Sequence, residues 1–313
     1  MRLFILGAQA PHSLMDKKLF WREFWILWGL GVIADATAAF ISKLPVTVLT
    51  NYLFIEGYDR HQPWFVGLEA AEIVFEMAIA VGVGLLAARA IGLGAPLLEA
   101  WLRGERSYPS LSSLLVPTLL VGVAVGALVE ARNLPVLHPN REASRRQARA
   151  FVNSPDSAKA MAALTRFTGA RTTPASETLY DVAGAISAAP YRLFWISGFA
   201  WIFVRIRRAG PGEPSRGILC VAILATAAIG AVFYFASQSA YHDATKWVLA
   251  GLSLPRDPSW AVTARNLLNI LPWSIGLGWL YTRKGLECTV VASLVAQATE
   301  HLLLVYVIVR FFH

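Results

Sequence analysis

The run GAISAAPYRLFWISGFAWIF, residues 184–203, is almost wholly apolar and yet contains Pro190 and Arg192. About 20 apolar residues in an α-helix cross the roughly 30 Å hydrocarbon core of a bilayer, so the run predicts a membrane-crossing helix. An arginine near the centre of such a helix costs at least ~2.5–3.5 kcal/mol, which makes Arg192 a candidate functional residue. Pro190 is expected to kink the helix beside it.

The rest of the chain has the composition of a membrane protein. Of its 313 residues, 56% are hydrophobic and 15% are charged, and the mean hydropathy is +0.51. A soluble domain carries about 25% charged residues. We expect an all-α fold, a polytopic transmembrane helical bundle that forms one integral-membrane domain over residues 1–313. Seven apolar runs predict its spans: 20–43, 65–91, 112–131, 178–205, 216–238, 260–281 and 286–311. An eighth span is expected if the short amphipathic segment HDATKWVLAGL enters the membrane.

Basic residues in the short loops predict the orientation of the bundle. Alternating spans place all four basic clusters on one side, and basic loops face the cytoplasm. We therefore expect a cytoplasmic N-terminus in a bacterial inner membrane, and no nucleic-acid partner for the net charge of +8. The clusters are Lys17, Lys18 and Arg22; Arg103 and Arg106; Arg205, Arg207 and Arg208; and Arg283 with Lys284. Tryptophans near the expected span ends fit an interfacial belt: Trp21, Trp25, Trp64, Trp101, Trp260 and Trp279.

The segment 132–175 is rich in arginine and poor in acids, and seven-span topology places it outside the membrane on the far side. We interpret it as an extramembrane helical arm. Because long loops follow the charge rule weakly, its positive charge does not decide the topology. A surface that binds a partner or lipid headgroups is the alternative.

A stripe of acidic residues lies within the second expected span. Glu69, Glu72 and Glu76 are spaced i, i+3, i+7 and share one helical face. Such a stripe binds a metal, lines a polar cavity or pairs with arginine. The stripe offers too few ligands for a metal, and no Glu-x-x-His pattern accompanies it, so no metal is expected. A buried ion pair between Glu76 and Arg192 is the predicted arrangement.

Two later spans also carry polar stripes. In the last span Ser293, Gln297 and His301 follow at i, i+4 and i+8, with Glu300 beside them. Polar residues on one face of a membrane helix indicate interhelical hydrogen bonding, and a face that lines a site is the alternative. The fifth span repeats the pattern with Tyr234, Gln238 and, at its edge, His242.

Two segments carry a family resemblance: LLAARAIGLGAPLLEAWLRGE, residues 85–105, and GLGWLYTRKGLECTVVASLVAQ, residues 276–297. Together with the start FWREFWILWGLGVIA they resemble the CAAX-protease and bacteriocin-processing (CPBP) family of intramembrane proteases. The resemblance covers most of the chain and implies a CPBP-like bundle. It also implies a substrate class of prenylated or otherwise hydrophobic peptides.

Active members of that family carry Glu-Glu-x-x-x-Arg, Phe-x-x-x-His and His-x-x-x-Asn or Asp on separate helices, and the glutamate activates water. Aligned on these motifs, the chain keeps the arginine and loses the base and the imidazoles. Serine, alanine and glutamine do not titrate near neutral pH and cannot replace them. The motif positions are Ser187, Ala188 and Arg192; Tyr234 and Gln238; and Ser293 and Gln297.

The resemblance therefore implies a non-catalytic pseudoprotease with a retained polar cavity for binding or scaffolding, without a cofactor. Its expected partners are the bilayer and a hydrophobic or prenylated peptide or membrane protein. One alternative is an active CPBP-type endopeptidase that uses shifted residues, with a carboxylate and His301 or His242 within about 4 Å of each other across one pocket. Its candidates are Asp181, His242, Glu300 and His301. The other alternative is a transporter-like protein built on the acidic face and Arg192.

Overall fold

The computed structural model describes residues 17–42, 47–105, 111–140, 142–143, 146, 174–207, 214–248 and 257–312. Within these ranges the side chains of 54, 55, 111, 174, 177, 236–248 and 304–312 are not described. Every regular element in the described part is helical, as the composition predicts.

Each expected span has a helix whose bounds agree to within a few residues, apart from a longer fifth one. The long helices are α1 (Lys17–Ser42), α3 (Pro63–Ala90), α5 (Leu111–Glu130), α8 (Pro174–Ile206), α9 (Arg216–Val248) and α12 (Leu286–Phe312). The sixth is built from α10 (Ser259–Leu271), the π-helical turn η3 (Pro272–Gly276) and α11 (Leu277–Lys284). The short elements are α2 (Val48–Ile55), α4 (Pro96–Arg103), η1 (Ala131–Asn133) and η2 (Pro135–Leu137).

Four helices in the described residues are long and apolar enough to cross a membrane: Lys17–Ser42, Pro63–Ala90, Ser112–Asn133 and Arg216–Phe235. This is the architecture of an integral membrane protein. α8, with Pro190 and Arg192 inside it, is not one of the four, although it is among the longest helices in the chain. It runs unbroken through Pro190.

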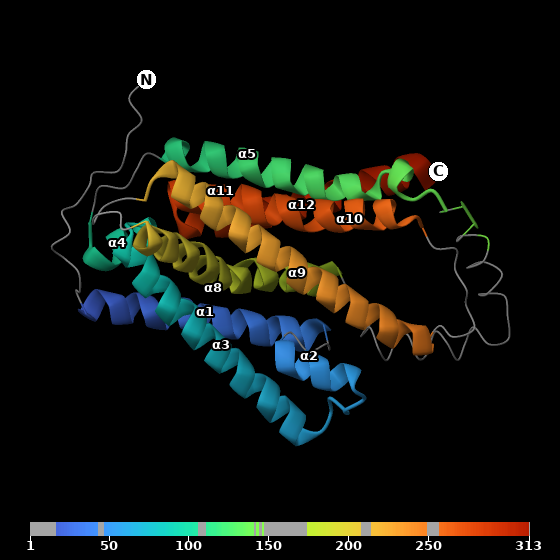
Figure 1. The fold of residues 1–313 in the computed structure, drawn as a ribbon, viewed down its shortest axis with the longest axis horizontal. Helices are drawn as coiled ribbons and strands as arrows, with labels where there is room; N and C mark the ends of the chain where they lie inside the picture. Colours follow the sequence, from blue (N-terminus) through green and yellow to red (C-terminus); the bar gives the residue numbers. More distant parts are fainter. Residues whose placement is uncertain are drawn as a thin grey trace.

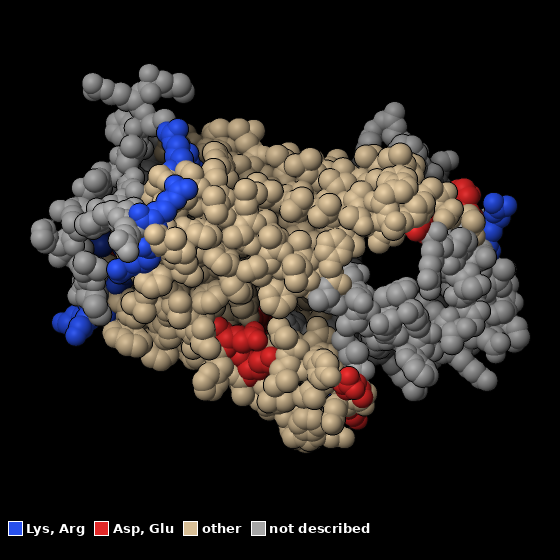
Figure 2. Space-filling view, viewed as in Figure 1, with Lys and Arg blue, Asp and Glu red and all other residues tan. Residues whose placement is uncertain are grey.

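The long helices lie side by side and alternate in direction (Figure 1). The starts of α1, α5 and α12 and the ends of α8 and α11 gather at one end, beside α4. The described members of the four basic clusters lie at this basic end, where Lys and Arg colour the surface in Figure 2. All six tryptophans assigned to the interfacial belt are exposed.

Glycines allow the closest helix contacts. A Cβ on Gly122 of α5 would lie 2.7 Å from the Cβ of Val295, and one on Gly126 would overlap the backbone of Ala296, so α5 and α12 pack along a glycine seam. On α3, a Cβ on Gly84 would lie 2.9 Å from Leu193 of α8. Small residues are what permit such close approach in membrane bundles.

The structure departs from the sequence expectations in three places. The described part of HDATKWVLAGL, residues 242–248, is not a separate piece, because it belongs to α9, which continues to Val248. The short helices α2 and α4 were not predicted. Of the expected arm, the structure describes residues 132–140 and a few beyond, and η1 and η2 in this part pack on α10.

Candidate functional site

Arg192 contacts the last helix. Its Nη1 donates a hydrogen bond to Ser293 Oγ at 3.1 Å, which joins α8 to α12. Ser293 is fully buried and donates in turn to the backbone oxygen of Thr289 at 2.8 Å. Two positions that the resemblance aligns with a motif arginine and a motif histidine therefore touch in space.

The other motif positions do not all join this contact. Gln297 lies one turn beyond Ser293, and its Oε1 is buried without a hydrogen-bond partner among the described residues. Ser187 is buried and faces Asp35 of α1, so it lies away from the Arg192 contact. Ala188 is partly buried and Tyr234 touches the ring of Phe235. The side chains of Gln238 and His242 lie outside the described residues.

The predicted ion pair between Glu76 and Arg192 is wrong. Glu76 instead accepts a hydrogen bond from the hydroxyl of Tyr191 at 3.1 Å. Successive residues of an α-helix point about 100° apart. Tyr191 therefore faces α3, and Arg192, the next residue, faces α12. The sequence predicted the helix α8 correctly. It could not show whether Tyr191 or Arg192 would contact Glu76.

The acids of the stripe have separate structural partners. Glu72 accepts hydrogen bonds from the backbone N–H groups of Leu49 at 2.7 Å and Thr50 at 3.1 Å, and so caps the first turn of α2. Glu69 lies 3.5 Å from Arg60, which also donates to the end of α1. Glu69 is thus engaged on its own, whereas Glu72 and Glu76 lie within reach of each other. With Tyr191 of α8 and Asp35 of α1 they form one acidic cluster between α1, α3 and α8.

The shifted candidates include one close pair. His301 Nε2 lies 2.6 Å from Asp181 Oδ2, which joins α12 to α8 near the end opposite the basic loops. The side chains are 53% and 21% exposed. The adjacent Glu300 forms an ion pair with Arg132, whose guanidinium also donates to Asn269 of α10. Asp181 meets the 4 Å distance that the active alternative requires, but the same alternative also requires that the pair face one pocket, and the His301 side chain is 53% exposed.

A second ionic group holds the start of the arm on α10. Arg265 Nη1 lies 2.6 Å from Asp257 Oδ2, and the backbone N–H of Asn140 donates to Asp257 Oδ1 at 3.1 Å. Burial raises the pKa of Asp257, but the hydrogen bonds from Arg265 and Asn140 outweigh it, and the pKa lies below its ordinary value. This carboxylate is therefore a structural anchor.

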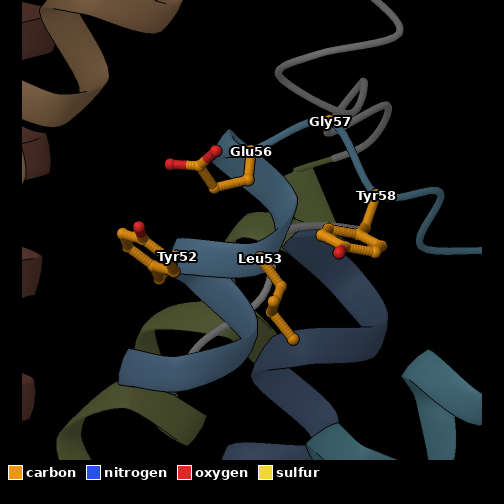
Figure 3. Close-up of a pocket in the computed structure, with 5 residues that line it drawn as sticks. All are labelled: Tyr52, Leu53, Glu56, Gly57 and Tyr58. Carbon is orange, nitrogen blue, oxygen red and sulfur yellow. The ribbon is translucent and has the colours of Figure 1, made fainter.

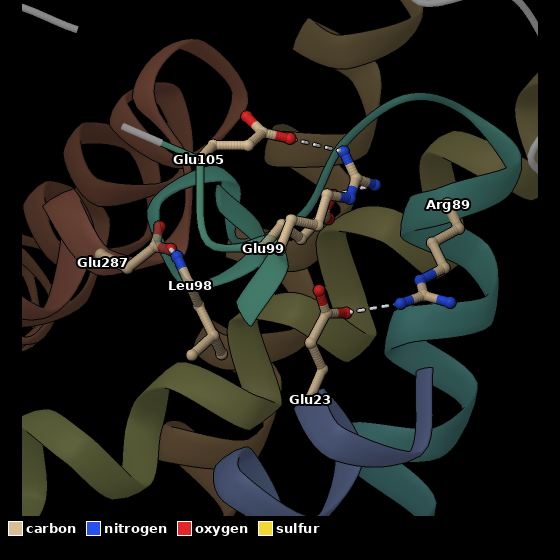
Figure 4. Close-up of polar contacts among 7 residues, drawn as sticks. Glu23, Arg89, Leu98, Glu99, Glu105 and Glu287 are labelled. Atoms are coloured by element: carbon tan, nitrogen blue, oxygen red, sulfur yellow. Dashed lines mark hydrogen bonds and ion pairs between the residues drawn. The ribbon is translucent and has the colours of Figure 1, made fainter. Parts of the chain in front are cut away.

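The two segments that carry the family resemblance meet at the basic end (Figure 4). Glu287, at the start of α12, accepts a hydrogen bond from the backbone N–H of Leu98 at 2.7 Å and another from Leu97, and so caps α4. The backbone N–H of Leu286 donates to the oxygen of Gly94 at 3.1 Å. Gly285 has φ +94°, a left-handed conformation that favours glycine, and packs on Pro96.

Close to this junction, α1 and α3 are joined by a buried ion pair. Arg89 Nη2 lies 2.8 Å from Glu23 Oε2, and the Glu23 side chain is fully buried (Figure 4). The Arg89 guanidinium also lies over the ring of Phe20, 5.2 Å from its centroid. Sequence reasoning missed Glu23, although an acid inside an apolar run was a signal for it.

An open hollow of about 390 Å³ lies at the end of α2, lined by Tyr52, Leu53, Glu56, Gly57 and Tyr58 (Figure 3). None of the predicted site residues lines it. Among the described residues no three His, Cys, Asp or Glu side chains are grouped to hold a metal ion.

No family model, curated protein or solved structure matches this chain.

Proposed function

We propose that the chain is a CPBP-like membrane protein that binds a hydrophobic partner without hydrolysing it. The observation that carries this proposal is the contact between Arg192 and Ser293, two positions aligned with catalytic motifs on separate helices. The junction of residues 85–105 with 276–297 through Glu287 supports it, because both segments that resemble the family belong to one contact.

The finer topology belongs to the same proposal. Seven spans, a cytoplasmic N-terminus and a place in a bacterial inner membrane agree with basic clusters that gather at one end of the bundle.

The chemistry of the contact favours binding. Hydrolysis of a peptide needs a base that activates water and groups that stabilise an oxyanion. A guanidinium stays protonated and a serine hydroxyl without a neighbouring base is a weak nucleophile. Arg192 and Ser293 can hold a polar group, but they supply no base.

The test is hydrolysis of reporter peptides, prenylated and unprenylated, by the purified protein in nanodiscs. We expect no cleavage above that of empty nanodiscs. Cleavage that Arg192→Ala abolishes, and that the matched variant Arg205→Ala at the exposed end of α8 leaves intact, would overturn the proposal.

A second function is favoured by one observation, the 2.6 Å contact between Asp181 and His301. A carboxylate that orients an imidazole is an arrangement suited to general base catalysis. An active endopeptidase built on this pair predicts cleavage that His301→Ala and Asp181→Asn abolish and that His61→Ala, at an exposed histidine, leaves unchanged. Absence of cleavage by the unmodified protein removes this candidate.

A further inference from the structure

Arg192 differs from the other partly buried arginines in what it contacts. Each of four others has a carboxylate partner in the described residues: Arg60 with Glu69, Arg89 with Glu23, Arg132 with Glu300, and Arg265 with Asp257. In the same described part, the hydrogen bond of Arg192 goes to the neutral hydroxyl of Ser293, and Arg192 forms no ion pair. It is a cation without a counter-ion there.

Its depth makes this arrangement costly. At 1.5 Å per residue, Arg192 lies about 27 Å from the start of α8 at Pro174 and about 21 Å from its end at Ile206. A guanidinium carries five N–H donors, and the contact with Ser293 uses one. A charge held at this depth is strongly unfavourable without acceptors, and the described residues supply one.

The surroundings leave room for such an acceptor. Asp181 and Arg192 both contact α12, and Gly184 and Ala188 lie between them on the same face of α8. A Cβ on Gly184 would meet nothing within 4 Å, so there is open space at this position. Gln297 lies between Ser293 and His301 on α12, with its buried Oε1 unpartnered among the described residues.

We call this strip the α8–α12 lane. Its residues are Asp181, Gly184, Ala188 and Arg192 of α8, with Ser293, Gln297 and His301 of α12. Gly184 and Arg192 are about 12 Å apart along the helix, which corresponds to three or four extended peptide residues.

We propose that the α8–α12 lane binds an amphiphile that ends in a single carboxylate, with the carboxylate on Arg192 and the apolar chain along Gly184 and Ala188. A guanidinium binds a carboxylate through two parallel N–H bonds. The lane has one unpaired cation, which suits a monoanion better than a phosphate dianion. By rotation the Gln297 amide presents its N–H₂ to the same group. This inference rests on the proposed function, because a protein that does not hydrolyse its ligand keeps that ligand bound.

The experiment measures binding to the full chain in nanodiscs with two probes, dodecanoate and a hydrophobic peptide with a free C-terminal carboxylate. We expect saturable binding of at least one, and at least tenfold weaker binding of methyl dodecanoate and of the C-terminally amidated peptide. The probe that binds more tightly identifies the source of the carboxylate, a lipid or a peptide.

Variants place the ligand in the lane. Arg192→Gln is expected to weaken binding at least tenfold, whereas the matched variant Arg205→Gln leaves it unchanged. Ala188→Leu keeps the guanidinium and fills the lane, so it should block binding even if Arg192→Gln fails to fold. Equal binding of acid and ester, displacement by chloride alone, or full binding by Ala188→Leu would overturn the inference.

The outcome is separable from that of the proposed function. Cleavage of a reporter peptide refutes the proposed function whatever binds to Arg192. Absence of both cleavage and carboxylate binding refutes only the lane as a carboxylate site.

Discussion

Glu287 provides the sharpest test of how the helices are joined, because a single carboxylate caps a helix that lies 189 residues earlier in the sequence. It accepts N–H groups from Leu97 and Leu98 at the start of α4. A hydrogen bond to a charged group contributes about 1.5–3 kcal/mol, and loss of a helix cap costs about 0.5–2 kcal/mol. Because the two contacts share one carboxylate and are not additive, we expect Glu287→Ala to destabilise the protein by about 3 kcal/mol.

The conservative variant separates charge from geometry. Glu287→Gln keeps a carbonyl oxygen that can accept one N–H, so about half of the loss is expected. The assay is an SDS titration of the purified protein followed by tryptophan fluorescence, with hydrogen exchange of the α4 amides as a local measure. Glu105→Ala, at an exposed acid beside the same junction, is the matched control. A Glu287→Ala variant as stable as that control would refute the capping role.

Three further predictions concern other parts of the fold. Glu72→Ala should speed hydrogen exchange in the first turn of α2 and cost about 1–2 kcal/mol, because the helix loses its cap. Gly126→Ala should cost about 1–3 kcal/mol by forcing α5 away from α12, whereas Gly29→Ala, whose Cβ meets nothing within 4 Å, should not. The pKa of Asp257 is lowered, so its pair with Arg265 stabilises the fold above the unfolded pKa of about 3.9 and loses this effect as pH falls through the folded pKa.

Each of these has a defined contrary result. If hydrogen exchange in the first turn of α2 is unchanged in Glu72→Ala, other contacts of α2 are sufficient to hold this turn without the cap. Equal stability of the two glycine variants would refute the seam. For the acid transition, Asp257→Asn should flatten the fall in stability that begins as pH drops to about 3.9 and continues below it. An unaltered pH dependence would show that other groups cause this fall.

The positions of the long helices could be predicted from apolar runs, because length and hydropathy are local properties of the sequence. The short helices α2 and α4 could not. Each is stabilised at its first turn by a carboxylate from another helix, Glu72 for α2 and Glu287 for α4. Such a cap depends on tertiary contact, which no local pattern encodes.

For the candidate site, the sequence supplied only a resemblance. That resemblance aligns Arg192 and Ser293 with two different motifs, and the two side chains are in contact. The partner of Glu76 was mistaken because neighbouring residues on a helix differ in direction by about 100°, and the sequence does not fix the rotation of α8 about its axis. Asp181 and His301 are 120 positions apart in the sequence. The sequence offered this pair as one of several possible combinations of an acid with a histidine.

The dependence of α4 and α5 on α12 has a consequence for biosynthesis. Both helices leave the ribosome long before the residues that complete them, the glutamate that caps α4 and the surface that meets Gly122 and Gly126. Until α12 arrives, the membrane must accommodate a half-finished assembly with an uncapped turn and a glycine groove facing lipid. Insertion of the early helices and packing of the complete bundle are therefore separate events, and the second requires translation to pass residue 299.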